Sequence, residues 1–265
     1  MDKLIKGLIC NGHARVYLAY TTELVEEARK RHDLWPTAAA ALGRTLSIAA
    51  VMGGMLKTKE EKISIIINGG GELGTILVDA YPDGGVRGFV ANPHVMLVNE
   101  ETKKLDVGKA VGTDGYLRVI RDTSLKDDFT GTTALQSGEI GEDFAYYFTV
   151  SEQVPTAISV GVLVNDDMRV NSAGVFMLQM MPNATEEDIL MCEDIITGLK
   201  PISTLVSEVD TPEELLEEIF GEEIEILETE ELEFRCDCSK ERMAEALTTL
   251  KEEDLEDMIR EDKGW

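Results

Sequence analysis

The chain is poor in the residues that most often carry chemistry. Its 265 residues include four cysteines, three histidines and two tryptophans. The sequence contains no Gly-x-Ser-x-Gly elbow, no Walker phosphate-binding loop and no His-Glu-x-x-His zinc motif, which argues against a serine hydrolase, a P-loop nucleotidase and a metalloprotease. Because His13, His32 and His94 are scattered, we expect each to be a surface or core residue rather than a ligand or a base.

Basic residues are scarce in the last third of the chain. Residues 1–181 carry 18 basic and 23 acidic side chains, residues 182–265 carry 7 and 28, and the net charge is −26. A surface of this sign repels phosphate backbones and anionic lipid headgroups. We therefore expect neither nucleic acid nor a membrane surface as a partner.

The N-terminus lacks the apolar core and the small-residue cleavage site of a secretion signal, and we expect a cytoplasmic protein. In a reducing compartment thiols stay free unless they bind a metal or take part in redox chemistry. Cys10 and Cys192 lie among apolar residues, which predicts two buried, unreactive thiols.

Apolar periodicity predicts an α+β domain in residues 1–181, a mixed β-sheet packed around a buried helix. Residues 35–56 are apolar nearly all round, which predicts that helix, and Arg44 within it argues against a membrane span. A β-hairpin is expected over residues 62–89. Further strands are predicted in 3–20, 115–121, the aromatic run 144–148, 157–164 and 174–181.

Residues 182–265 change in character and become strongly acidic. Capping residues predict one helix after Thr185 and another after Thr211. Extended pieces in 224–234 and two short helices in 239–259 follow. Since these elements are too few to form a good core, we expect them to dock elsewhere or to stay loose. The apolar stripes of the first two helices are Ile189, Ile195, Ile196 and Leu199, and Leu215, Leu216, Ile219 and Phe220.

Cys236 and Cys238 are separated by one residue, so both sulfurs can turn to one side of a tight turn, where zinc would hold them as thiolates. Nearby Arg235 favours the thiolate form. A structural zinc site takes four ligands, and neither Cys nor His follows Cys238. A disulfide within the pair would be strained and labile, which favours a switch between a metal-bound and an oxidised state. Two ordinary surface cysteines are the alternative.

A methionine-rich stretch borders the acidic region. Core packing is the simpler interpretation, but flexible methionine side chains also suit a surface that accepts many apolar partners. At this border, a movable appendage could cover such a surface. The stretch consists of Phe176, Met177, Leu178, Met180 and Met181, with Met191 beyond it.

Taken together, these segments resemble the family of the 33 kDa heat-shock protein, the redox-regulated holdase chaperones of bacteria. The likeness spans nearly the whole chain. The matching runs are Trp35 to Gly53, Gly71 to Gly74, Gly85 to Val90, Val111 to Leu117, Gly138 to Asp143, Ala145 to Phe148, Ser151 to Thr156, Gln179 to Pro182, and Phe234 to Ser239.

The resemblance implies a core domain (1–181), an acidic helical linker (182–233) and a C-terminal redox and zinc module (234–265). In the family, a Cys-x-Cys pair and a later Cys-x-x-Cys pair hold one zinc ion when reduced. Oxidation converts the pairs to disulfides, zinc leaves, and the linker loosens to expose a client-binding surface. Cys236 and Cys238 match the first pair. Because Trp265 stands about where the second pair should begin, the module is expected to be truncated and its zinc site incomplete.

We therefore expect an ATP-independent holdase, not an enzyme, whose partners are unfolding client proteins; the resemblance leaves open a homodimer in the oxidised state. One rival is a thiol-disulfide oxidoreductase using Cys236 and Cys238, although a thioredoxin-like Cys-x-x-Cys is missing. Another is a binding module whose acidic tail recognises a basic partner. The expected client-binding residues are Phe176, Met177, Leu178, Met180, Met181, Leu215, Leu216, Ile219 and Phe220.

Overall fold

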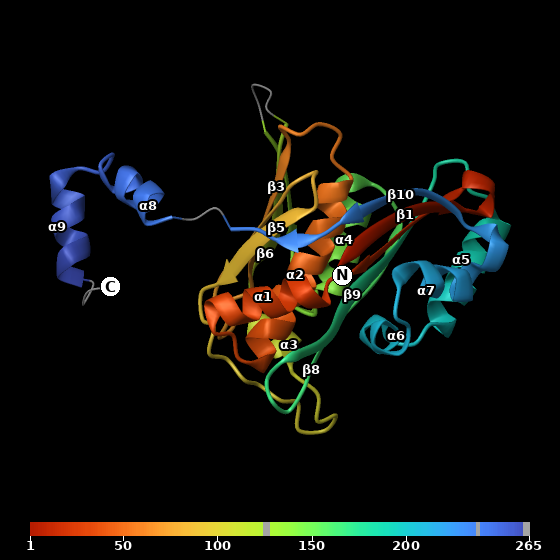
Figure 1. Ribbon diagram of the computed structural model, residues 1–265, viewed down its shortest axis with the longest axis horizontal. Helices are drawn as coiled ribbons and strands as arrows, with labels where there is room; N and C mark the ends of the chain where they lie inside the picture. Colours follow the sequence, from red (N-terminus) through yellow and green to blue (C-terminus); the bar gives the residue numbers. More distant parts are fainter. Residues whose placement is uncertain (124–127, 237–238, 262–265) are drawn as a thin grey trace. The chain divides into compact units, whose positions relative to one another are not determined.

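The computed structural model describes residues 1–123, 128–236 and 239–261. The chain forms two compact units, Met1–Phe234 and Arg235–Trp265. The first unit contains two β-sheets with helices α1 to α7, and the second contains helices α8 and α9 (Figure 1). The predicted α+β class is confirmed.

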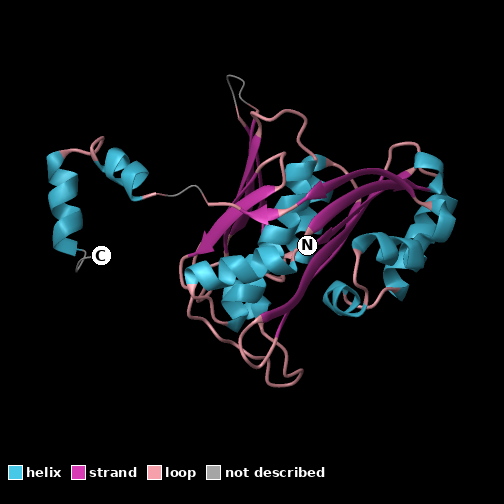
Figure 2. Ribbon diagram, in the orientation of Figure 1, coloured by secondary structure: helices cyan, strands magenta, loops and turns pink. Residues whose placement is uncertain are grey.

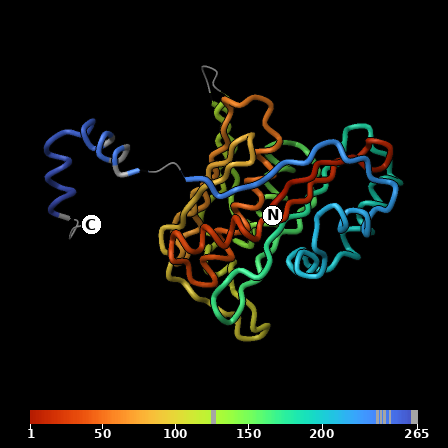
Figure 3. The backbone as a smooth tube through the Cα atoms, viewed as in Figure 1, coloured from red at the N-terminus to blue at the C-terminus, as the bar shows by residue number. Residues whose placement is uncertain are grey.

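The first sheet has the strand order β10-β1-β2-β9-β8 and is antiparallel throughout. Its outermost strand β10 comes from the acidic region and pairs with the first strand of the chain, so segments from the two ends of this unit run side by side (Figure 3). The strands are β1 Lys3–Ile9, β2 Ala14–Tyr20, β8 Thr156–Val164, β9 Val170–Met180 and β10 Glu225–Glu231.

The second sheet has the order β11-β5-β4-β3-β6-β7, in which β11 runs parallel to β5 and the other neighbours are antiparallel. It contains the predicted hairpin of residues 62–89. The strands are β3 Lys62–Asn68, β4 Ile76–Ala80, β5 Gly85–Val90, β6 Tyr116–Asp122, β7 Phe129–Ala134 and β11 Glu233–Phe234.

In the first unit, helices pack against both sheets (Figure 2). Short 3-10 turns occur at Cys10–Gly12 (η1) and Gly221–Glu223 (η3), and a π turn (η2) at Phe148–Glu152. The α-helices are α1 Thr22–His32, α2 Pro36–Gly54, α3 Val107–Val111, α4 Gly141–Tyr147, α5 Glu186–Gly198, α6 Ile202–Glu208, α7 Pro212–Phe220, α8 Lys240–Leu247 and α9 Glu252–Glu261.

Helix α2 is the predicted buried helix. Pro36 occupies its first turn, where a missing N–H costs nothing, and every residue from Pro36 to Gly53 except Arg44 is buried. The helix contacts strands of both sheets. Arg44 reaches out of the core and donates to the carboxylate of Glu139 at 2.6 Å. Within the described ranges no helix combines the length and the apolar content that a membrane span requires.

The aromatic run 144–148 was predicted as a strand, and this prediction is wrong. Residues 141–147 form helix α4, because the carboxylate of Asp143 accepts the backbone N–H of Ile140 at 3.1 Å and holds the first turn. Phe144, Tyr147 and Phe148 are buried at helical spacing, whereas Tyr146 is 39% exposed. The i, i+3, i+4 spacing of the aromatics outweighs their strand propensity.

Helices α5 to α7 of the acidic region dock on the first sheet, which is one of the two alternatives that the sequence left open. Helices α5 and α7 begin after Thr185 and Thr211, whose side chains accept the backbone N–H groups of Asp188 and Glu214, and the extended piece after residue 224 becomes β10. Helix α6 was not predicted. Since residues 182–233 lie within the first compact unit, their separation from residues 1–181 as a linker stays a prediction.

A buried carboxyl at the start of the chain gives the first testable prediction. Asp2 is 4% exposed, and its Oδ2 accepts the N–H of Leu24 in the first turn of α1 at 2.7 Å. Burial raises the pKa of Asp2 from 3.8 to about 6. The folded chain therefore binds this proton more tightly than the unfolded chain does, and the contribution of Asp2 to stability is lost as pH rises from about 4 through 6.

We expect Asp2→Asn, which keeps a hydrogen-bond acceptor without the charge, to raise the free energy of unfolding at pH 7 by about 2–3 kcal/mol. The gain should shrink as pH falls from 7 towards 4, because the folded chain then keeps Asp2 protonated and the unfolded chain begins to protonate it. Urea unfolding between pH 4 and 7 measures it, with Glu101→Gln, at an exposed carboxyl, as the control. A gain that is equal at every pH would contradict the assignment.

Candidate functional site

One face of the first sheet is apolar across three adjacent strands. Register places Ile5, Leu18 and Phe176 in one row across β1, β2 and β9, and Ile9, Ala14 and Met180 in another. Between them, Val16 stands opposite Leu178. Side chains two residues apart share a face of a strand, so these rows form one continuous surface. We call it the apolar face; its residues are Ile5, Ile9, Ala14, Val16, Leu18, Phe176, Leu178 and Met180.

Helices α5, α6 and α7 pack over the apolar face, and we call them, with their connecting loops, the cover (residues 186–220; Figure 2). The rings of Phe176 and Phe220 stack with centroids 6.2 Å apart. Helix α6 lies so close to β9 that a Cβ at Gly174 would stand 2.8 Å from Val206. The cover residues buried here are Cys192, Ile202, Leu215, Leu216 and Phe220.

The structure brings together most of the predicted client-binding residues and separates two of them. Phe176, Leu178, Met180, Leu215, Leu216, Ile219 and Phe220 all belong to this cluster. Met177 is fully buried but outside it, because neighbouring strand residues point to opposite faces. Met181 follows β9 and also lies outside the cluster. Sequence reasoning missed the residues of β1 and β2, whose alternation predicted strands but not their partners.

Few polar contacts hold the cover to the sheet. The Nζ of Lys3 is 3.0 Å from Glu213, and the Nδ1 of His13 is 2.7 Å from Asp188. The hydroxyl of Ser172 donates to the backbone oxygen of Ser203 at 2.7 Å. Both ion pairs lie at the edge of the cluster, within reach of solvent, and such pairs contribute about 1 kcal/mol or less each. Apolar burial is therefore the main force that docks the cover.

Helix α5 is the least buried part of the cover. Cys192 is its one fully buried residue, and Ile189, predicted as part of the apolar stripe, is 40% exposed. A groove of about 270 Å³ runs between α5 and the end of the sheet, lined by Leu178, Met180 and Ile196 among others. Because this groove leaves part of the contact between α5 and the sheet unpacked, less packing energy is lost when α5 is released than when a helix leaves a close-packed core.

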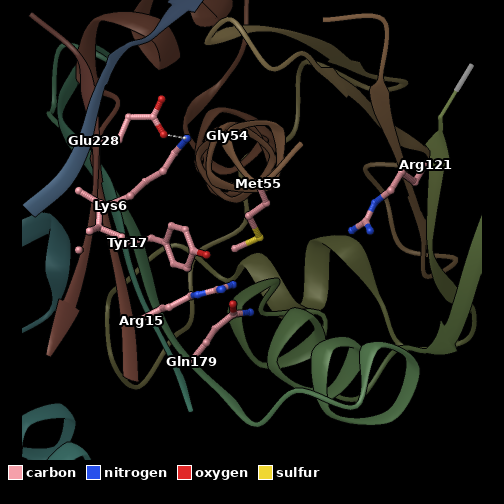
Figure 4. A pocket seen from close by; sticks show the side chains of 10 residues that line it. Lys6, Arg15, Tyr17, Gly54, Met55, Arg121, Gln179 and Glu228 are labelled. Carbon is pink, nitrogen blue, oxygen red and sulfur yellow. Dashed lines mark hydrogen bonds and ion pairs between the residues drawn. The ribbon is translucent and has the colours of Figure 1, made fainter. Parts of the chain in front are cut away.

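A second hollow of about 350 Å³ lies beside β10 (Figure 4). Lys6, Arg15 and Arg121 line it together with Gln179, which gathers hydrogen-bond donors in a chain that is otherwise acidic. Lys6 forms an ion pair with Glu228 of β10 at 2.9 Å. The cations come from β1, β2 and β6, so no local motif in the sequence marks this hollow.

The pair Cys236 and Cys238 is described in part. Cys236 is half-buried just after β11, and Cys238 lies outside the described residues. Over residues 1–123, 128–236 and 239–261, no group of three or more His, Cys, Asp and Glu side chains is arranged to hold a metal ion. The two thiols suit zinc in chemical type, but they supply only half of the four ligands of a structural site.

Cys10 and Cys192, by contrast, meet in the fold. Both are free thiols; Cys192 is 3% exposed, but Cys10, which was predicted to be buried, is only half-buried. Burial raises the pKa of both thiols, that of Cys192 to about 12, and both side chains belong to the apolar cluster between the cover and the sheet. The sequence held no signal for this contact between its two ends.

The comparisons with known proteins agree with this arrangement. The profile of the family described as Hsp33 protein matches residues 2–265. The chain is 49% identical to the 33 kDa chaperonin of Oceanobacillus iheyensis over 264 residues, covering 99% of this chain and 91% of that protein. It is 47% identical to the 33 kDa chaperonin of Bacillus subtilis over 262 residues, covering 99% and 90%.

A solved structure shows the same fold. The crystal structure of the 33 kDa chaperonin from Thermotoga maritima, a heat shock protein 33 homolog, matches with a TM-score of 0.89 at 41% identity, covering 99% of this chain and 90% of that one. The resemblance drawn from the sequence motifs is thereby confirmed. The chain belongs to the Hsp33 family of chaperones.

Proposed function

We propose that the chain is an ATP-independent holdase that binds unfolding proteins on the apolar face after the cover has moved away. The observation that carries this proposal is an apolar surface across three strands, hidden by three short acidic helices. An exposed apolar surface of that extent promotes association, so a holdase must hide it at rest. The chaperonin names of the relatives support the chaperone part.

The charge of the cover favours its release. Residues 186–220 carry eleven acidic side chains and one basic side chain, Lys200. Their mutual repulsion opposes compact docking, and the helices are too short to be stable in isolation. The same carboxylates would keep a complex with an apolar client soluble. Docking and release are therefore close in free energy.

The proposed client surface has two parts. The apolar face contributes Phe176, Leu178 and Met180, and the released cover adds the apolar stripe of Leu215, Leu216, Ile219 and Phe220. Met177 and Met181 lie outside this surface and are not part of it. We also propose that two copies of the chain with open covers pair through the same surface and so form the homodimer that the resemblance leaves open for the oxidised state.

We propose that oxidation of the thiols Cys236 and Cys238 controls the release of the cover, and we call this pair the gate. Phe234, two residues before Cys236, is 7% exposed; its ring meets that of His32 edge to face at 6.0 Å. β10 ends three residues before Phe234 and is joined to α7 by the short turn η3. Disorder beginning at the thiols would therefore spread through β11 and β10 into the cover.

Zinc is the proposed cofactor of the reduced state. Cys236 and Cys238 would hold it as thiolates, and two further ligands would complete the site. Bound zinc supplies folding free energy to the small unit that it organises. Oxidation of the two thiols to a disulfide removes both thiolate ligands and with them that stabilisation.

Light scattering from a heat-unfolding client protein tests the proposal. We expect the peroxide-treated chain to suppress client aggregation, whereas the reduced chain suppresses it weakly. The double variant Cys236→Ser, Cys238→Ser should not respond to peroxide, and Glu256→Gln, at an exposed residue of the same unit, should respond like the parent.

Two outcomes would count against the proposal in different ways. Failure to suppress aggregation in either redox state would overturn the holdase function. Equal suppression before and after peroxide would overturn only the gate. Turnover of a small disulfide substrate, abolished by Cys236→Ser, would favour the oxidoreductase instead.

A further inference from the structure

Two thiols that are far apart in the sequence both lie where the cover touches the sheet. Cys10 belongs to the turn η1 between β1 and β2, and Cys192 lies on α5. Both side chains belong to the apolar cluster between the cover and the sheet, and the Sγ of Cys10 is 3.8 Å from the Sδ of Met191, the residue next to Cys192. The sulfur of Cys10 thus lies against the segment of α5 that carries Cys192.

The surroundings give the two thiols different roles. Cys10 is half-buried in a turn with a left-handed backbone (φ 52°), so a small oxidant can reach it. Cys192 is 3% exposed and is the one buried residue of α5, so it reacts with whatever forms on Cys10 rather than with solvent. Both thiols are protonated at neutral pH because burial raises their pKa values, which makes their oxidation slow.

We propose that Cys10 and Cys192 form a disulfide under peroxide and that this bond ties α5 to the β1–β2 turn. The effect is opposite in sign to that of the proposed gate. Oxidation at Cys236 and Cys238 would loosen the cover, whereas a bond between Cys10 and Cys192 would hold the first helix of the cover in place. The bond itself does not depend on the proposed function, but its consequence for client binding does.

The chemistry requires one molecule of peroxide. The sulfur of Cys10 attacks one peroxide oxygen, the O–O bond breaks, and a sulfenic acid and one water are formed. The sulfur of Cys192 then attacks the sulfur of Cys10, the S–S bond forms, and the S–O bond breaks to release a second water. The two thiol protons leave in the two waters, and the two sulfurs supply the two electrons that reduce the peroxide.

The cross-link changes which part of the cover can move. It joins the start of the chain to α5, so α5 can no longer leave the sheet, whereas α6 and α7 are held by their own contacts. Because the bond removes freedom mainly from the released state, local opening of α5 should become about tenfold rarer or more.

Peptide mapping by mass spectrometry tests the proposal in the intact 265-residue chain. In the double variant Cys236→Ser, Cys238→Ser, peroxide should produce a non-reduced peptide pair joined through Cys10 and Cys192, lighter by two hydrogen atoms than the separate peptides. Amide hydrogen exchange in residues 186–198 should slow about tenfold or more on oxidation and recover with dithiothreitol. Adding Cys10→Ser to the variant should remove both effects.

Three results would overturn the proposal. Cys10 could stop at the sulfenic or sulfinic acid with Cys192 still free for alkylation. The cross-link could form only in denatured protein. It could also form in the folded protein and leave hydrogen exchange in α5 unchanged. None of these readouts uses a client protein, so failure here is distinguishable from failure of the holdase function.

Discussion

Replacing Leu216 by aspartate should make the chain suppress client aggregation without any oxidant. Leu216 is 1% exposed and lies on α7 within the cluster that joins the cover to the apolar face. Losing the buried side chain and placing an unpaired carboxylate there costs on the order of 4 kcal/mol. This free energy destabilises only the docked cover, because the aspartate is hydrated once the cover is released. The equilibrium therefore shifts towards the released cover.

The remainder of the first unit should survive this change, since α2 and the second sheet form a separate part of the core on the other side of the first sheet. Light scattering under reducing conditions measures the activity, and binding of an apolar dye measures exposure of the face. Glu217→Ala, the exposed neighbour on the same helix, is the matched control.

If Leu216→Asp unfolds the whole unit, Phe220→Ala can replace it in the same measurements, because it weakens the same contact without adding a charge. A variant that keeps its fold, binds the dye strongly and still fails to suppress aggregation would show that uncovering the face is not sufficient for client binding.

Phe234→Ala should release the end of the first unit and loosen β10. The Phe234 ring is nearly buried, with the guanidinium of Arg31 5.5 Å from its centroid and His32 against its edge. Removing it costs about 3 kcal/mol. β10 then depends on its ladder with β1 and on the ion pairs of Lys6, because most of its side chains are exposed.

Hydrogen exchange in residues 225–234 should become about a hundredfold faster in this variant, and the reduced chain should gain part of the holdase activity. Glu225→Ala, at an exposed position of β10, should change exchange little. If the melting temperature falls while exchange in this segment stays the same, Phe234 stabilises the unit but does not connect the thiols to the cover.

Short-range sequence patterns predicted the elements that depend on neighbouring residues, such as a continuous apolar run or a helix cap. The unbroken apolar run of α2 has no polar face to offer water, and Thr185 and Thr211 cap helices with their own side chains, so all three were foreseen. The run at 144–148 was not, because the strand propensity of its aromatics concealed a helical spacing supported by Asp143.

Long-range pairing could not be predicted in the same way. No sequence feature of residues 225–231 identifies β1 as the strand with which they pair. The alternation of side chains along β9 likewise does not show which face of that strand the helices cover. For that reason Met177 was grouped with Phe176 although the two point to opposite faces. The contact of Cys10 with Cys192 is missing from the prediction for the same reason, since it exists only once α5 has docked.

The pairing of β10 with β1 also constrains the order in which the protein can be completed on the ribosome. The outer edge of β1 emerges first, and its hydrogen-bonding partner is translated only when residues 225–231 have been added. At about 5–20 residues per second, that edge waits roughly 10 to 45 seconds. During this interval the nascent chain carries an unpaired strand of the kind that invites aggregation, so a protein proposed to protect others passes through a vulnerable stage of its own.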